Sequence, residues 1–313
     1  MKLLKQLLSA GLVLTLALLL TACGGNNAGS SSDEPTPASG PVRIATKPMT
    51  EQYILGEMLG LLIEQAGYKV EITKGIGGGT SNIHPAMESG EFDLYPEYTS
   101  SGWVMVLDHK AEGMDDEEMY AKLQQEYQEK FDMTWVGMYG FNNTFTIAVR
   151  GDVAEEYHLE NTSDLAAVAG SLTFGGNPDY IERADGFNAL CETYGLKFGN
   201  QVDIDIGLKY QALASGDIDV TNAFTTDAQL ANPNTDVVTL ADDKHLQVNY
   251  FCSTVVRRDA LERFPGLEAA LLQMDGVLSD QEMASLNYQV EVEGLNERDV
   301  ARDFLIQKGV LGA

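Results

Sequence analysis

The sequence predicts an α/β fold of two similar lobes, with a cleft between the lobes and two crossover segments that connect them. Two observations predict this fold. Short apolar runs of strand length alternate with segments whose apolar residues recur at helical spacing. One such strand–helix–strand arrangement then recurs in the second half of the chain, which is typical of a fold with two copies of one plan.

The first copy begins with an expected strand at residues 42–46. A helix follows from Thr50, with apolar residues at helical spacing and a stop signal at Gly67. The next expected elements are a strand at 70–73, a glycine-rich turn at 75–79, a helix that ends at Gly90 and a strand at 92–95. This order predicts a parallel sheet with helical crossovers.

The second copy is recognised by a motif, Ser-Gly-acid-apolar-Asp-apolar, that occurs within residues 87–99 and again within 213–225. Each motif is followed by an aromatic residue and a threonine, Tyr98-Thr99 and Phe224-Thr225. Ligands of open α/β sheets bind beyond the carboxyl ends of the strands, so we expect these two loops to face one cleft. The alternative is that Ser-Gly-Asp only ends a helix before a strand. Strands at 171–175 and 202–206 complete the second copy.

Three further helices, at 115–131, 280–289 and 297–308, are expected to cover the lobes. The last two follow the second copy, and we expect them to pack back on the first lobe. The chain would then cross between lobes near 141–145 and near 250–254. The predicted lobes are therefore residues 41–142 plus 253–313 and residues 143–252.

Residues 1–22 are predicted to be a lipoprotein signal peptide. Lys2 and Lys5 precede an apolar stretch that is too short to span a bilayer comfortably. The sequence Leu20-Thr21-Ala22-Cys23 resembles the bacterial lipobox, in which the cysteine carries acyl chains, so we expect Cys23 to anchor the protein outside the cytoplasm. Residues 23–40 form a flexible tether, since no large apolar residue follows the cysteine there. The alternative is an ordinary secreted protein.

The net charge of −27 argues against nucleic acid as a partner, because such binding needs a basic surface. The acidity mildly favours cationic ligands by electrostatic steering, although solubility of the protein is the more ordinary reason for it. Besides Cys23 the chain has only Cys191 and Cys252, which either pair or remain free thiols.

No constellation of catalytic residues appears in the sequence. Neither an H-E-x-x-H nor a G-x-S-x-G motif occurs. We therefore predict no catalytic residues, no metal site and no cofactor. Two other classes remain as alternatives: a lipid-anchored hydrolase, for which Asp93 and Glu97 would be the carboxylate pair, and an adhesin or structural lipoprotein. The four histidines are scattered: His84, His109, His158 and His245.

Several motifs together resemble the substrate-binding proteins of ABC transporters for glycine betaine, carnitine, choline and related osmoprotectants. They occur in order over the whole chain after the tether: TEQYILGEM at 50–58, GGT at 78–80, ESGEFDLYPEYT at 88–99, GFNNTF at 140–145, LKYQA at 208–212 and DQEMASLNY at 280–288. The resemblance implies a two-lobed periplasmic-binding-protein-like fold and an aromatic cage for a small quaternary amine. It also implies an ABC permease and its ATPase as partners.

The resemblance places Tyr98 and Tyr210 first among the residues expected in the cage, with Phe224 and Tyr180 as further candidates. A trimethylammonium group has no hydrogen to donate, but aromatic faces attract its charge, by about 0.5–2 kcal/mol each. A betaine carboxylate would take donors at helix starts and at the crossing. The polar candidates are Gln52, Gly79, Thr80, Ser101, Asn143, Thr144, Arg183 and Thr225.

Two features leave the ligand open. The glycines at 75–79 are not followed by the lysine of a phosphate-binding loop, so a tight turn without ligand is the main alternative there. The loop at 97–101, Glu-Tyr-Thr-Ser-Ser, departs from the commoner Glu-Tyr-Thr-Gly-Thr of the family, and Trp103 follows it. A receptor for ergothioneine, a larger histidine-derived betaine, is therefore an alternative to one for glycine betaine, carnitine or choline.

Overall fold

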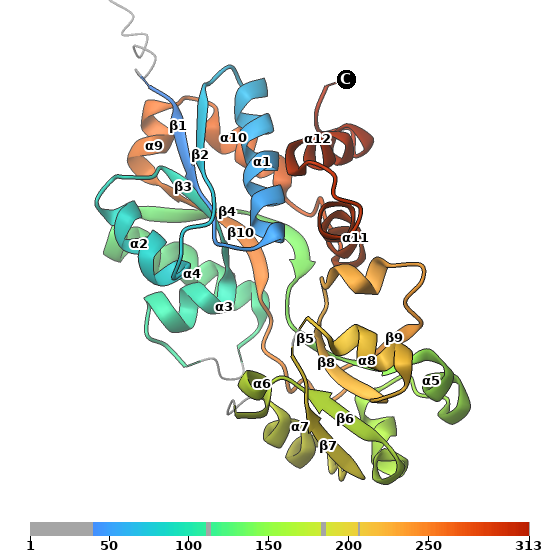
Figure 1. Cartoon of the computed structure of the whole chain (residues 1–313). Coiled ribbons are helices and arrows are strands. Elements are labelled where there is room, and N and C mark those ends of the chain that lie inside the picture. Colours follow the sequence, from blue (N-terminus) through green and yellow to red (C-terminus); the bar gives the residue numbers. More distant parts are fainter. Residues whose placement is uncertain (1–39, 111–113, 183–185, 206, 313) are drawn as a thin grey trace, which may run out of the picture. The chain divides into compact units, whose positions relative to one another are not determined.

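The computed structural model of the chain describes residues 40–110, 114–182, 186–205 and 207–312 (Figure 1). The predicted signal peptide, Cys23 and Arg183 lie outside these residues. The predicted tether also lies outside them, except for Gly40. Two five-stranded sheets organise the described part of the chain. Each mixes parallel and antiparallel strands, so the predicted α/β class is confirmed.

The first sheet has the strand order β2-β1-β3-β10-β4. Strand β1 runs parallel to β2 and β3, whereas β10 runs antiparallel to β3 and β4. The bounds are β1 Val42–Ala45, β2 Val70–Thr73, β3 Leu94–Tyr98, β4 Met133–Asn142 and β10 Phe251–Arg257. A strand from late in the chain is therefore built into the centre of the first sheet.

The second sheet repeats this plan in the order β7-β6-β8-β5-β9. Strand β6 is parallel to β7 and β8, and β5 is antiparallel to β8 and β9. The bounds are β5 Phe145–Arg150, β6 Thr173–Gly176, β7 Asn200–Asp203, β8 Val220–Phe224 and β9 Val237–Leu240. The two copies inferred from the sequence correspond to these two sheets.

Strand β3 ends three residues later than the expected strand at 92–95. Its partner β10 pairs along its whole length, from Val256 opposite Leu94 to Cys252 opposite Tyr98. Pairing with a strand so distant in sequence holds residues 96–98 extended, although Pro96 and the following polar residues carry no local strand signal.

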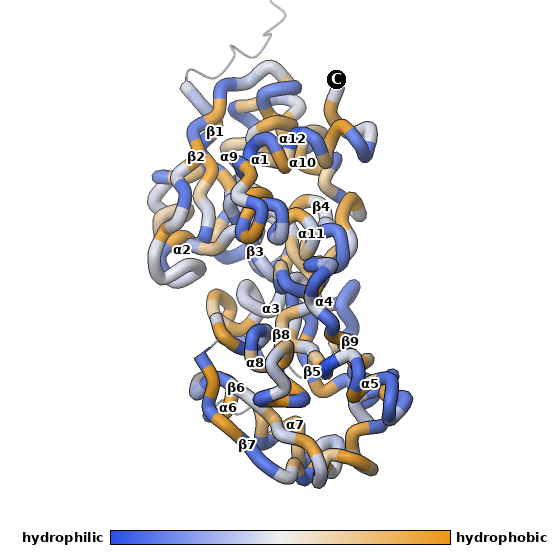
Figure 2. Tube along the Cα trace, turned by 45° about the vertical axis from the view of Figure 1, so that its right-hand side comes forward, coloured by the Kyte–Doolittle hydropathy of each residue, from blue (hydrophilic) through white to orange (hydrophobic). Residues whose placement is uncertain are grey.

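Helices cover both sheets, and hydrophobic (orange) and hydrophilic (blue) stretches alternate along the trace (Figure 2). Side chains cap the N-termini of some of the longer helices: the Asp115 side chain accepts from Glu117 and Glu118 at the start of α4, and Ser279 forms a capping box with Glu282 at the start of α11. Their bounds are α1 Thr50–Gln65, α2 Thr80–Glu88, α4 Asp116–Phe131, α7 Phe187–Tyr194, α11 Asp280–Glu291 and α12 Glu297–Gln307.

Shorter turns of helix connect the remaining elements. They are α3 Thr99–Ser101, the π-helical η1 Gly102–Val106, α5 Gly151–Tyr157, η2 Thr162–Ala167, η3 Ala169–Ser171, α6 Pro178–Glu182, α8 Lys209–Ser215, η4 Ala228–Ala231, α9 Arg258–Arg263, α10 Leu267–Leu271 and η5 Leu272–Met274.

The core divides by sheet and by sheet face. Neighbouring strand residues point to opposite faces, so Val255 joins one cluster of the first sheet and Val256 the other. Helix α1 is buried along most of its length and contacts α10, α11 and α12. The last two helices therefore pack on the first sheet's α1, and α11 also contacts η4 of the second copy.

Two adjacent segments carry the chain between the sheets. The first is Asn143 and Thr144, between β4 and β5, and the second runs from β9 to β10. Hydrogen bonds join them: the Asn143 N–H donates to the Tyr250 carbonyl at 3.2 Å, and the Tyr250 N–H donates to Asn142 Oδ1 at 2.7 Å. The predicted lobe boundaries at 142/143 and 252/253 stay a prediction.

Candidate ligand-binding site

A pocket of about 220 Å³ lies beside the crossing segments, and four aromatic side chains line it. We call it the aromatic pocket. Its rings come from four separate segments: the end of β3, the start of β5, the end of β8 and the residue before β10. The lining residues are Tyr98, Asn143, Thr144, Phe145, Phe224 and Tyr250. Residues from both sheets therefore meet here.

Tyr98 is held by a buried carboxylate. It is the last residue of β3 and is only 5% exposed. Its hydroxyl donates to Glu51 Oε1 at 2.5 Å, and the Lys47 ammonium lies 4.7 Å from the centre of its ring. Burial, and secondly the nearby Glu51 charge, raise the pKa of Tyr98 well above its usual value, so the phenol stays protonated and remains a donor.

Phe145 and Phe224 form the other half of the pocket as a stacked pair. They are opposite each other in the β5–β8 ladder, and their ring centres lie 4.7 Å apart with planes inclined by 27°. Tyr180 in α6 is buried and its ring centre lies 5.1 Å from that of Phe145. Tyr180 is not among the lining residues, so it supports Phe145 from behind.

Tyr98 and Tyr210 are both predicted first for the cage, but Tyr210 is placed differently. Its hydroxyl donates to Asp227 Oδ2 at 2.8 Å, and it is not among the residues that line the aromatic pocket. The Lys209 ammonium lies 2.6 Å from the same Asp227 oxygen, and 5.1 Å and 5.9 Å from the ring centres of Tyr210 and Phe224. Tyr210 thus belongs to the Lys209–Asp227 pair next to Phe224.

Each half of the pocket has such an ion pair beside its aromatic residue. In the first half Lys47 pairs with Glu97, the residue before Tyr98, and both are buried. Glu97 Oε2 also accepts from the Thr80 hydroxyl at 2.8 Å. Because both lysines are neutralised by their own carboxylates, neither brings an uncompensated positive charge to the pocket.

The other polar candidates fall into two groups. Asn143 and Thr144 line the aromatic pocket, and Thr225 joins the crossing segments, because the Thr144 N–H donates to its hydroxyl at 3.1 Å. Gln52 is fully buried, and its Nε2 has no partner among the described residues. Gly79, with φ of +52°, and Thr80 begin helix α2, and Ser101 ends α3.

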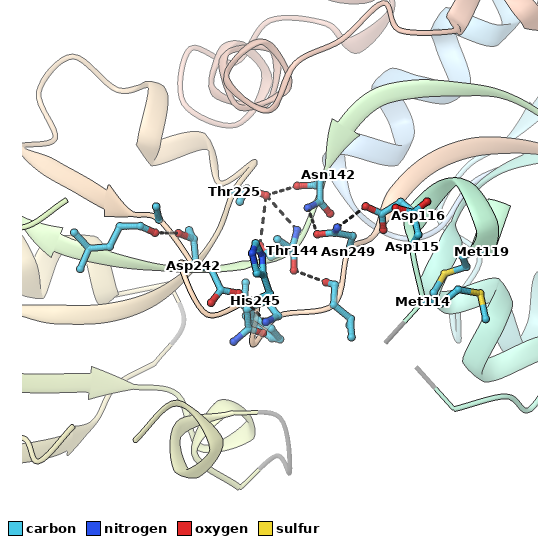
Figure 3. Close-up of a pocket in the computed structure, with 16 residues that line it drawn as sticks. Met114, Asp115, Asp116, Met119, Asn142, Thr144, Thr225, Asp242, His245 and Asn249 are labelled. Carbon is cyan, nitrogen blue, oxygen red and sulfur yellow. Dashed lines mark hydrogen bonds between the residues drawn. The ribbon is translucent and has the colours of Figure 1, made fainter. Parts of the chain in front are cut away.

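A larger cavity of about 480 Å³ lies alongside and shares Thr144 and Phe145 with the aromatic pocket. Its walls are mainly polar and acidic. Asn249 bridges this cavity, since it accepts from Asn142 at 2.7 Å and donates to Asp116 at 2.8 Å (Figure 3). Phe145 is its only Phe, Tyr or Trp lining residue among those the structure describes. Of these two pockets, the smaller one is therefore the one lined by four aromatic rings.

Within residues 40–312, apart from the undescribed gaps, no cluster of three or more His, Cys, Asp or Glu side chains is arranged to hold a metal ion. The helices that the structure describes are all too short or too polar to cross a membrane. Cys191 and Cys252 both carry free thiols.

Comparison with known proteins identifies the family. Residues 40–307 match the family described as the substrate binding domain of the ABC-type glycine betaine transport system. The chain belongs to this family. The predicted resemblance is thus confirmed, and so is the two-lobed fold it implied. The glycine betaine transport family is one of transport receptors, not of enzymes, and substrate-binding proteins of ABC importers act outside the cytoplasm.

Two curated relatives are similar to this chain over most of its length. The ergothioneine transport permease/ergothioneine binding protein EgtU of Helicobacter pylori is 40% identical over 270 residues. The match covers 86% of this chain but 48% of EgtU, so the chain spans about half the length of that relative. The carnitine transport binding protein OpuCC of Listeria monocytogenes is 33% identical over 297 residues, which cover 94% of this chain and 93% of OpuCC.

Solved structures show the same fold. A crystal structure of a glycine betaine/carnitine/choline ABC transporter protein superposes with a TM-score of 0.80 at 31% identity, covering 86% of this chain and 99% of the other. Apo YehZ from Escherichia coli has a TM-score of 0.76 at 29% identity, over 87% and 100% of the two chains.

Sequence reasoning missed three residues at the site. Phe145 and Tyr250 line the aromatic pocket, and Glu51 holds the Tyr98 hydroxyl. Phe145 ends a motif that was recognised, and Tyr250 begins the predicted second crossing, so both signals were present. Glu51 precedes Gln52 in the first turn of α1, where an acidic residue is ordinarily explained by the helix N-terminus.

Proposed function

We propose that this protein is the receptor of an ABC importer for quaternary-amine compounds of the glycine betaine, carnitine and choline type, and that it catalyses no reaction. One observation carries the proposal: four aromatic rings from four segments of the chain line one small pocket. Hydrogen bonds cannot recognise a trimethylammonium group, whereas ring faces attract it. Three or four rings at about 0.5–2 kcal/mol each, with contacts to the rest of the ligand, suffice for micromolar binding.

The cage we propose consists of Tyr98, Phe145, Phe224 and Tyr250, with Tyr180 and Tyr210 supporting it. A ligand carboxylate needs N–H and O–H donors, and the free Nε2 of buried Gln52 supports Gln52 in that role together with Asn143 and Thr144. The remaining proposed contacts are Gly79, Thr80, Ser101, Arg183 and Thr225.

Ligand capture would close the two lobes on each other. We propose lobes of residues 41–142 plus 253–313 and residues 143–252, which hinge at the paired crossing segments. A ligand held by rings from both sheets favours the closed state, and the closed state would dock on the permease.

A receptor for ergothioneine is the second candidate for the same pocket. The observation that favours it is the 40% identity with EgtU, an ergothioneine transport permease/ergothioneine binding protein. Ergothioneine also carries a trimethylammonium group, so both candidates predict the same cage and differ in what surrounds the rest of the ligand.

Calorimetric titration of the soluble chain, without residues 1–23, with glycine betaine, carnitine, choline, proline betaine and ergothioneine tests the function. We expect stoichiometric binding of at least one of them and no turnover. Preference for ergothioneine over the others would select the second candidate. If none of the five binds, the proposed function is wrong.

Membrane attachment through Cys23 is a separate part of the proposal. Multiple acyl chains would anchor the protein, since each buried CH₂ contributes about 0.8 kcal/mol. Metabolic labelling with an alkyne fatty acid should label the wild-type protein and leave a Cys23→Ala variant unlabelled. Equal labelling of both would remove Cys23 as the acylated residue.

A further inference from the structure

Glu51 is a buried carboxylate that no cation neutralises within the described part of the chain. Its side chain is 3% exposed, and none of the ion pairs between described residues includes it. Oε1 accepts two hydrogen bonds, from the Tyr98 hydroxyl at 2.5 Å and from Asn143 Nδ2 at 3.0 Å. Oε2 has no partner. Tyr98 and Asn143 both line the aromatic pocket, so Glu51 lies directly behind its wall.

A small chamber of about 130 Å³ lies on the other side of this carboxylate. Glu51, Asn143 and Phe224 line it, as does Asn287, which is buried and whose Oδ1 has no partner among the described residues. No Lys, Arg or His is among the described residues that line it. The described lining therefore offers Glu51 hydrogen-bond donors such as Asn143, but no cation that would neutralise its charge.

The two nearby lysines do not supply the missing positive charge. Lys47 pairs with Glu97, and Lys209 pairs with Asp227 at 2.6 Å. The N-terminus of α1, in whose first turn Glu51 lies, contributes only partial positive charge. A buried carboxylate left in this state attracts a cation to the open spaces beside it. Of the two pockets next to Glu51, the aromatic pocket is the one that also offers four ring faces to a methylated cation.

We propose that Glu51 is a specificity-determining residue, whose negative charge makes the pocket select a permanent cation over a neutral ligand of the same shape. The inference rests on the proposed function and deepens it. The charge acts in two ways. It attracts the cation across the wall, and through the Tyr98 hydroxyl it increases the negative charge of the ring face that the cation contacts. Glu51 itself does not touch the ligand.

Proton release would accompany this selection. Burial raises the pKa of Glu51, although hydrogen bonding from Tyr98 opposes the rise. A cation bound next to the carboxylate favours its charged form, so binding should expel the proton that a fraction of the free protein carries. Affinity for a cation then rises with pH until Glu51 is ionised in the free protein. The other charged or titratable groups that face Glu51 are Tyr98, Cys252, Lys47, Glu97, Asp227 and Glu291.

The test compares glycine betaine with tert-butylacetate, its neutral-headed isostere, by calorimetry on wild type and Glu51→Gln. Glutamine keeps the acceptor for Tyr98 and removes the charge. We expect the variant to bind glycine betaine about tenfold more weakly. Its affinity for tert-butylacetate should be the same or higher, because this ligand has no positive charge and its carboxylate is repelled by Glu51. The matched control is Glu291→Gln, which removes the same charge from an exposed residue of the same chamber and should change affinity by less than about twofold.

Proton release provides a second readout that a purely structural role would not change. Titrations in two buffers of different ionisation enthalpy, between about pH 5 and pH 8, should show proton release on wild type and none on Glu51→Gln. If Glu51→Gln loses affinity for both ligands equally, or keeps the wild-type preference for the cation, the inference is wrong while the receptor function stands. If wild type binds none of the methylated cations, both fail.

Discussion

Phe145 and Phe224 stack across two neighbouring strands, with their ring centres 4.7 Å apart, and they line the same pocket as Tyr98 from the other sheet. The pair belongs to one sheet and Tyr98 to the other. The pocket therefore exists only when both sheets are formed and joined by the crossing segments.

Removing one ring of the stacked pair should weaken binding and also affect the other ring. We expect Phe224→Ala and Phe145→Ala each to weaken glycine betaine binding about tenfold, a loss of about 1.4 kcal/mol. The double variant should lose less than the sum of the two, because each ring orients the other. Calorimetry on wild type, the two single variants and the double variant gives the coupling energy. If the two losses of binding free energy simply add, the two rings do not act as one ligand surface.

Tyr98 and Tyr210 should differ in what they contribute. Tyr98→Ala removes a ring that lines the pocket and should weaken binding tenfold or more. Tyr210→Phe removes only a hydrogen bond to Asp227, so we expect affinity within about twofold and a loss of stability of about 1 kcal/mol. A large loss of affinity in Tyr210→Phe would show that its hydroxyl takes part in binding.

The buried Lys47–Glu97 pair should matter for stability more than any surface charge. Glu97→Gln leaves Lys47 buried without its counter-ion, which should lower the free energy of unfolding by about 3–5 kcal/mol. The ligand-free variant should therefore unfold at a lower urea concentration than wild type. Glu91→Gln, at an exposed position just before β3, serves as the control and should stay within about 0.5 kcal/mol of wild type. Similar urea unfolding midpoints for both variants would contradict the stabilising role of the Lys47–Glu97 pair.

Stability should fall in acid partly through Asp93. Burial opposes its charge, but hydrogen bonds from Arg43 and Arg263 outweigh this and hold the pKa of Asp93 below its usual value. The contribution is complete above the unfolded pKa, about 4, and is lost as the pH falls through the folded one. Urea titrations at several pH values should show a shallower acid dependence for Asp93→Asn than for wild type. Exposed Asp152→Asn should change the dependence much less, because solvent screens the ion pair between Asp152 and Arg150.

The two remaining cysteines should react as separate free thiols. Cys252 is fully buried and Cys191 half-buried, and burial raises the pKa of both. In a soluble form without Cys23, iodoacetamide should modify Cys191 slowly in the native state and Cys252 only after unfolding. An intact mass lighter by two hydrogen atoms, with neither thiol reactive, would instead reveal a disulfide.

Local sequence patterns were enough to recognise the two copies. Apolar spacing identified helix α1, and the motif repeated at 87–99 and 213–225 placed Tyr98 and Phe224 at equivalent strand ends. The structure brings both residues, with Asn143 and Thr144, into one pocket. Tyr210, predicted from its position in a motif, and Tyr180, a weaker candidate, are not among the residues that line the pocket.

The sequence by itself therefore determined the family, the α/β class and the strand ends at which a ligand site would form, because these depend on periodicity and on short motifs. Tertiary structure decided which rings meet. Tyr250 and Phe145 join Tyr98 and Phe224 through the register of β10 with β3 and of β5 with β8, strands that are far apart in the chain. Glu51 acquires its role in the same way, since only folding brings it to the Tyr98 hydroxyl and buries it away from any counter-ion among the described residues.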